Sequence, residues 1–145
     1  MSRYGRLIVP GDYSLGNIID RGNEWRDLWA HHVLEQNGIR AETHGSADLD
    51  LTIDGVWWEV KSSETSVVGV KPGNELDFIK KNLRRASHQF RDRGLGSARV
   101  VLNLRYRHAA SDDVLIREMK RRMAMHDVAE VLFIKSDGSL ERLYK

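Results

Sequence analysis

Apolar and polar residues alternate most regularly between Asp48 and Ser63. The alternation is interrupted once, at Asp54-Gly55, and then resumes. Successive side chains of a strand point to opposite faces, so this alternation is typical of strands with one buried face. Asp-Gly suits the central positions of a type I′ turn, where both residues take a positive φ. The segment therefore predicts a β-hairpin with a two-residue turn.

Other segments repeat their apolar residues at three- and four-residue steps, which is the period of an α-helix. These segments are 23–36, 74–92 and 112–126. Asn23 is a suitable N-cap for the first, and Ser111 or Asp112 for the last. We expect three helices, of which the second ends near Gly94.

A β-branched and apolar run over 98–104 predicts a buried strand. Shorter stretches predict strands over 39–43, 130–134 and 140–144. Helices and strands follow one another along the chain, so we expect an α/β fold in which helices flank a mixed central β-sheet. This single domain is expected over residues 21–145, preceded by an N-terminal arm over residues 1–20.

Length and composition agree with one globular domain. The chain has 145 residues, of which 41% are hydrophobic and 30% charged, and these values exclude a disordered chain. No apolar run approaches the roughly 20 residues that cross a bilayer, and the first residues do not resemble a signal peptide. We therefore expect no membrane association and a cytoplasmic site of action.

The absence of cysteine narrows the chemistry further. It excludes disulfides and thiolate metal sites, and it fits a reducing compartment. Any metal ion must then be held by carboxylates or histidines, and hard divalent cations such as Mg²⁺ prefer carboxylate oxygen. The net charge at pH 7 is only +2. Local clusters of basic residues, rather than the overall charge, must therefore indicate whether nucleic acid is a partner.

Counting outward from the hairpin turn places several charged side chains on one face. Asp50 falls opposite Glu59, and Asp48 falls opposite Lys61. Directly opposed residues have Cβ atoms roughly 4.5–5.5 Å apart. Two carboxylates at that spacing repel each other, and a bound divalent cation relieves the repulsion. Asp48 with Lys61 is equally an ordinary cross-strand pair, so the hairpin alone leaves a metal site and a solvent-facing surface evenly balanced.

The run from Asp50 to Lys61, DLTIDGVWWEVK, resembles the core motif of PD-(D/E)xK nucleases. In that superfamily an Asp opens one strand and Glu-x-Lys lies on the next; here Leu49 stands where the motif often has Pro. The resemblance implies that Asp50, Glu59 and the backbone carbonyl of Val60 hold a divalent metal ion. Mg²⁺ or Mn²⁺ is expected, with Zn²⁺ as a third candidate.

The same resemblance implies two further roles. Glu24, an acid on the preceding helix, would complete the outer shell of the metal, and Lys61 would orient the attacking water. Taken alone, Glu24 is better explained as a first-turn acid favoured by the helix dipole. The catalytic set that we expect is Glu24, Asp50, Glu59 and Lys61.

A larger part of the chain, residues 22–143, resembles one branch of the superfamily. These are the nuclease domains at the C-termini of contact-dependent growth inhibition toxins, many of which cleave tRNA. The similar stretches include RRASHQF, ARVVLNL and VLFIKSDGSLERL. The resemblance implies RNA, and tRNA in particular, as the substrate, and a cognate immunity protein as a partner.

The helix expected over 74–92 concentrates basic residues in its last three turns. Such a stripe would neutralise phosphates beside the site. The alternative is a solvated face with charges matched to the helix dipole, but the dominance of positive side chains in the last three turns favours the phosphate stripe. Trp57 projects on the carboxylate face and is a candidate for stacking on a base, but such residues more often pack under a helix. The residues expected in the stripe are Lys81, Arg84, Arg85, His88 and Gln89.

Two other functions stay open on the sequence. A DNA endonuclease of the same superfamily, restriction-like or resolvase-like, would use the same residues. A non-catalytic nucleic-acid-binding module would keep the fold, but the retention of all the polar site residues argues against it. Cleavage that depends on a metal ion separates the enzyme from the binding module.

Overall fold

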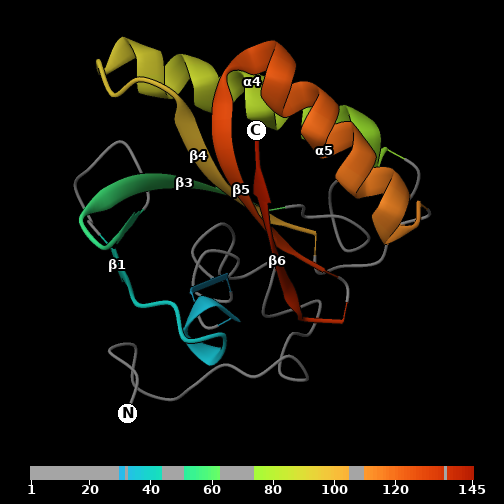
Figure 1. The fold of residues 1–145 in the computed structure, drawn as a ribbon, viewed down its shortest axis with the longest axis horizontal. Helices are drawn as coiled ribbons and strands as arrows, with labels where there is room; N and C mark the ends of the chain where they lie inside the picture. Colours follow the sequence, from blue (N-terminus) through green and yellow to red (C-terminus); the bar gives the residue numbers. More distant parts are fainter. Residues whose placement is uncertain (1–29, 32, 44–50, 63–73, 105–109, 136) are drawn as a thin grey trace, which may run out of the picture.

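The computed structural model of the chain describes residues 30–31, 33–43, 51–62, 74–104, 110–135 and 137–145. These residues form a mixed α/β structure around one six-stranded sheet (Figure 1). The expected N-terminal arm lies outside the described residues. The elements are β1 (Ala41–Thr43), β2 (Leu51–Ile53), β3 (Val56–Ser62), α4 (Glu75–Asp92), β4 (Ala98–Asn103), α5 (Asp112–His126), β5 (Val128–Ile134) and β6 (Leu140–Tyr144).

The strands lie in the sheet in their order along the chain, from β1 to β6. The β1–β2, β2–β3 and β5–β6 pairs are antiparallel, whereas β3–β4 and β4–β5 are parallel. Parallel neighbours need a crossover connection, and α4 and α5 supply the two crossovers. The expectation of an α/β fold with a mixed sheet flanked by helices is confirmed.

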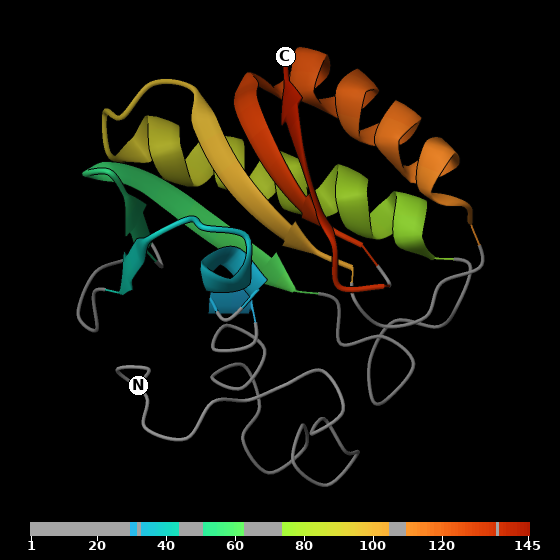
Figure 2. The same cartoon turned by 60° about the horizontal axis from the view of Figure 1, so that its bottom comes forward.

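The two long helices cover one face of the sheet. Figure 2 shows α4 and α5 together on this face, behind β3, β4 and β5. Apolar residues of both helices pack on alternate residues of the central strands, including Val100, Leu102 and Phe133. Leu83, Phe90, Leu115 and Met119 belong to the same cluster and are fully buried.

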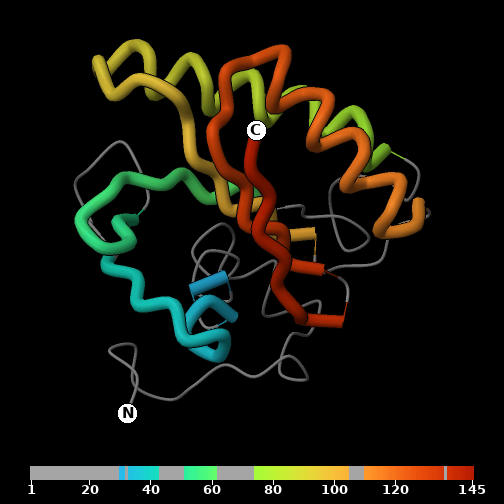
Figure 3. Tube along the Cα trace, in the orientation of Figure 1, coloured from blue at the N-terminus to red at the C-terminus, as the bar shows by residue number. Residues whose placement is uncertain are grey.

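The opposite face carries the described end of the first predicted helix, residues 30–36, of which residue 32 is not described. Its buried residues Ala30, Val33 and Leu34 form a second cluster with Trp58 and Val60, among others. The chain trace in Figure 3 follows this segment into β1 at the edge of the sheet. The sheet is therefore the middle of three layers, and each face of β3 has its own set of neighbours.

The observed boundaries of the helices and strands lie close to those that the apolar pattern and the capping residues predicted. Ser111 Oγ accepts a hydrogen bond of 3.3 Å from the Val114 amide, so Ser111 is the N-cap of α5. The final hairpin begins earlier than predicted: β5 starts at Val128 and not at residue 130. The reason is Asp127, which ends α5 in the left-handed conformation at φ 58° and turns the chain directly into the strand. In the part of the chain that the structure describes, no helix is long and apolar enough to cross a bilayer.

Candidate functional site

The β2–β3 hairpin fixes where the predicted acids fall. Asp54 and Gly55 have φ values of 52° and 78°, as a type I′ turn requires. Ile53 pairs with Val56, and the register continues outward to Leu51 opposite Trp58. The predicted turn and register are confirmed over these pairs. Asp48 and Asp50 lie outside the described residues, so their placement opposite Lys61 and Glu59 stays a prediction.

Glu59 lies on the helix-covered face of the sheet. It pairs in parallel register with Val100, which belongs to the core cluster beneath α4 and α5. Trp57, two residues earlier on the same side of β3, packs against that cluster as well. The carboxylate of Glu59 is accordingly buried, and the residue is only 3% exposed. A buried carboxylate is uncommon unless a charge or a ligand compensates it.

Lys61 supplies one compensating charge. Its Nζ lies 3.5 Å from Glu59 Oε2, and its side chain is 17% exposed. The two side chains therefore project from the same face of β3, as the alternation predicted. Removing an ion pair from water costs free energy that the mutual attraction often fails to recover, so apolar residues would serve stability as well. A buried carboxylate paired with a partly buried lysine on a central strand is hence a candidate for chemistry rather than for stability.

The first helix bears on the position of Glu24. Glu24 itself lies outside the described residues. The described end of that helix packs on the Trp58 and Val60 face, which is opposite to the face of Glu59 and Lys61. Within the described residues, no group of three or more Asp, Glu or His side chains is placed to hold a metal ion. The metal set that includes Glu24 and Asp50 therefore remains a prediction.

Val60 separates the two site residues along β3. Its side chain points into the second cluster and is 6% exposed, so only its backbone is available to the helix-covered face. The expectation that Val60 contributes its carbonyl oxygen to a metal site stays a prediction.

Glu75 is a second buried acid that the sequence argument did not select. It is the first residue of α4 and is 5% exposed. Because β3 and β4 are parallel and α4 connects them, α4 begins at the end of the sheet where β3 ends. Glu75 continues the buried stripe of Ile79 and Leu83 at four-residue spacing. That spacing was present in the sequence, and it placed Glu75 on the sheet-facing side of the helix.

The residues of the predicted nucleic-acid stripe on α4 differ in their exposure. Lys81, Arg84, Arg85 and His88 are exposed, and Lys81 Nζ lies 3.0 Å from Asp77 Oδ2. Gln89 is only partly exposed, and among the described residues its buried Oε1 has no hydrogen-bond partner. The exposed basic residues thus lie on the solvent side of α4, away from the buried Glu59. Binding by these residues and by the partly buried Trp57 stays a prediction.

Comparisons with known proteins add one structural relative. No family model matches the chain, and no curated protein matches it in sequence. The fold is similar to a solved chain described as "CdiA-CT/CdiI toxin and immunity complex from Burkholderia pseudomallei", with a TM-score of 0.57 and 17% sequence identity. The match covers 97% of this chain and 95% of that chain. The likeness shows a shared fold over nearly the whole length of both chains.

Proposed function

We propose that the chain is a metal-dependent endonuclease that hydrolyses phosphodiester bonds in RNA, with tRNA as the favoured substrate. The observation that carries this proposal is the pair of buried Glu59 and partly buried Lys61, 3.5 Å apart on β3. The pair forms the Glu-x-Lys part of the motif that resembles PD-(D/E)xK nucleases. Its burial under the helix layer separates it from an ordinary exposed strand pair, which contributes little.

The donor set fits a hard divalent cation. Glu59 presents carboxylate oxygen in a buried position, and the chain has no cysteine that would favour softer metals. Asp50, Glu59 and the carbonyl of Val60 would hold the ion, and Glu24 would complete its outer shell. When bound, such an ion supplies a Lewis acid for the phosphate and lowers the pKa of water.

Lys61 carries the part of the chemistry that the protein itself performs. Its ammonium group donates hydrogen bonds and orients the attacking water beside the phosphate. Glu59 Oε2 lies 3.5 Å from Nζ, and its negative charge holds the ammonium group in place. The positive charge of Lys61 also balances the negative charge that builds on the phosphate oxygens. The pair therefore acts as a unit, and removal of either member is expected to abolish cleavage.

We further propose that the chain acts as the toxin member of a toxin–immunity pair. The solved chain of similar fold comes from such a complex. The Glu-x-Lys pair favours the toxin over the immunity role, because inhibition by an immunity protein needs no nuclease motif. A cognate immunity protein is then the expected protein partner.

The direct test is incubation of the purified chain with total tRNA and with plasmid DNA, each with Mg²⁺ or with EDTA. We expect fragments from tRNA in Mg²⁺ only, because the proposed mechanism needs a bound divalent ion to polarise the phosphate. Sequencing of the cut ends identifies the position of cleavage.

Each other outcome corrects a different part of the proposal. Cleavage of plasmid alone assigns the chain to the DNA endonucleases of the superfamily. Equal cleavage in EDTA overturns the metal dependence. Stable binding of nucleic acid without cleavage under any divalent cation identifies a binding module instead.

A further inference from the structure

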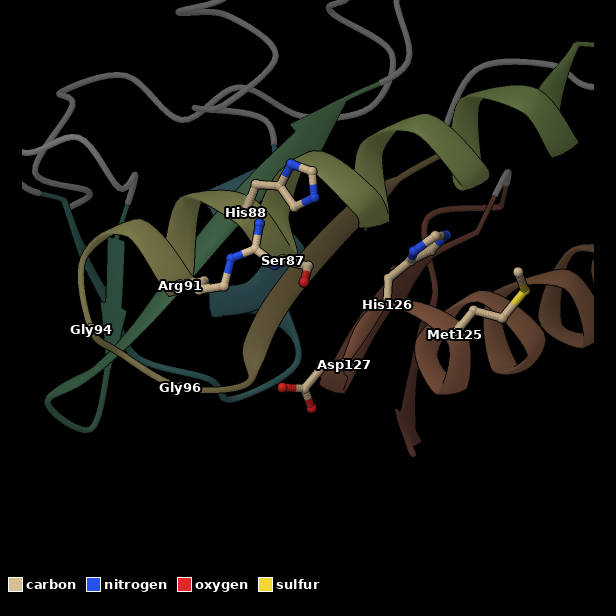
Figure 4. Close-up of a pocket in the computed structure, with 8 residues that line it drawn as sticks. All are labelled: Ser87, His88, Arg91, Gly94, Gly96, Met125, His126 and Asp127. Carbon is tan, nitrogen blue, oxygen red and sulfur yellow. The ribbon is translucent and has the colours of Figure 1, made fainter.

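A pocket lies at the far end of the helix layer, where α4 and α5 end. Its volume is about 560 Å³, which is within the range of sites for small ligands. Figure 4 shows its lining side chains, with His88 and His126 reaching toward the gap between the two helices. The lining residues are Ser87, His88, Arg91, Met125, His126 and Asp127, with Gly94 and Gly96 in the connecting loop.

Basic residues of α4 lie in and beside this pocket without acidic ion-pair partners among the described residues. Lys80, Arg84, His88 and Arg91 follow α4 at steps of four, four and three residues, so they share one side of the helix. Among the described residues none of these four has an acidic partner within ion-pair distance. A row of cations without neighbouring acids creates a positive potential that attracts anions.

His126 points to the same conclusion from α5. Its Nε2 atom is buried and has no hydrogen-bond partner within the described ranges. Burial lowers the pKa of His126 below its usual value, and the charges of Arg122, Arg84 and His88 lower it further. The ring therefore lies in a positive field with one nitrogen unpaired. That nitrogen would donate to an anionic oxygen when it carries a hydrogen and a small shift of the ring exposes it to the pocket.

Two features of the pocket disfavour a bound anion, and both are weaker than the attraction of the basic residues. Asp127 lines the pocket, but its Oδ1 accepts hydrogen bonds from Ser97 Oγ at 2.7 Å and from Lys145 Nζ at 3.3 Å. The carboxylate is thus already paired. The C-terminal ends of α4 and α5 each carry a partial negative charge of about half a unit, against the full charges of Arg84 and Arg91. The local balance remains positive.

We propose that this pocket binds a backbone phosphate of a nucleic acid, with His88, Arg91 and His126 as the donors and Arg84 as the neighbouring charge. Taking the ligand to be nucleic acid rests on the proposed function. The pocket lies at the C-terminal end of α4, whereas Glu75 lies at its start. The helix has 18 residues, which at roughly 1.5 Å each is about 27 Å. The pocket is therefore a second contact, well separated from the β3 end of the sheet.

Binding measured in EDTA tests the proposal without any cleavage. The probes are fluorescent RNA and DNA duplexes of one sequence. The two pocket variants are Arg91→Gln, which removes a lining cation, and Arg84→Gln, which removes the neighbouring charge that acts on His126. Arg117→Gln is the matched control, because Arg117 is an exposed cation of α5 that neither lines the pocket nor acts on His126. We expect each pocket variant to weaken binding roughly fivefold at about 0.15 M salt and to reduce the salt slope by about 1. The control should keep wild-type affinity.

A second measurement locates the anion directly. Titration with inorganic phosphate, followed by NMR of the histidine rings, should raise the pKa of His126, because a bound anion favours its charged form. Unchanged ring signals together with equal affinities of the pocket and control variants would overturn the proposal. Binding of polyglutamate but of neither duplex would overturn it too, and would assign the pocket to an acidic protein. Duplex binding through the pocket without Mg²⁺-dependent cleavage would instead contradict the proposed nuclease and leave the phosphate site standing.

Discussion

Single residues of β3 show how strand alternation places the Glu59–Lys61 pair on one face and apolar core residues on the other. Glu59 and Lys61 point to the helix layer, whereas Trp58 and Val60 point to the first helix. The sequence predicted this division, since it follows from the period of a strand. It did not predict that Glu59 would be buried, because burial depends on α4 and α5 packing over that face. Glu75 escaped prediction for the same reason, although its spacing from Ile79 and Leu83 was already visible.

His126 gives a prediction at the same scale. Its pKa is lowered in the folded chain, chiefly by burial and then by the positive groups Arg122, Arg84, His88 and Lys80. Protonation is therefore easier in the unfolded chain. The contribution of His126 to the free energy of unfolding should be complete above its usual pKa of 6.5 and should be lost as the pH falls through the lower folded value.

Urea unfolding of the wild type and of His126→Gln, at pH 7.5 and at pH 5.5, checks this sign. We expect the wild type to lose more stability on acidification than the variant, whose side chain does not titrate. The Ser97 hydrogen bond lowers the pKa of Asp127, so this carboxyl titrates below the pH range of the comparison. It is also present in both proteins and does not affect the difference between them. Equal losses in the two proteins would contradict the desolvation of an uncharged imidazole at this position.

At the scale of elements, the β2–β3 hairpin was the most predictable part of the chain. Asp54-Gly55 fixes the turn, and the turn fixes the register up to Leu51 opposite Trp58. Strand order was less accessible, because the parallel β3–β4 and β4–β5 contacts join residues far apart in sequence. The sequence did not predict that β5 begins as early as Val128. This start depends on the left-handed conformation of Asp127, which the apolar periodicity does not reveal.

Gly55→Ala tests the role of the turn. Gly55 has a φ of 78°, and an added Cβ would meet no atom within 4 Å, so the cost is conformational and not steric. We expect a loss of stability of about 1 kcal/mol, because an L side chain is disfavoured in this conformation. Asp54→Asn is the matched control, since Asn tolerates a positive φ. Thermal unfolding of both variants measures the difference, and an unchanged midpoint for Gly55→Ala would contradict the type I′ turn.

For the whole molecule, the two proposed sites lie at opposite ends of the α4 layer. One end holds the start of α4 near the end of β3, and the other holds the basic pocket between α4 and α5. The sequence predicted a basic helix beside an acidic hairpin, with a solvated face as the alternative, but it did not predict that some of the basic residues would lie toward α5. That arrangement depends on which stripe of α4 is apolar and on where α5 packs, and both are properties of the assembled fold.

The most direct measurement of the central claim is tRNA cleavage in Mg²⁺ by variants of the β3 pair. Glu59→Gln and Lys61→Met keep the size of each side chain and remove its charge. Glu141→Gln is the control, because Glu141 is paired with Lys135 at 2.8 Å on the far edge of the sheet. Both site variants are expected to lose cleavage by 10²-fold or more, an order of magnitude estimate from the loss of a positioned charge at a transition state, while the control cleaves like the wild type. Cleavage at the wild-type rate by a folded Glu59→Gln variant would contradict the account.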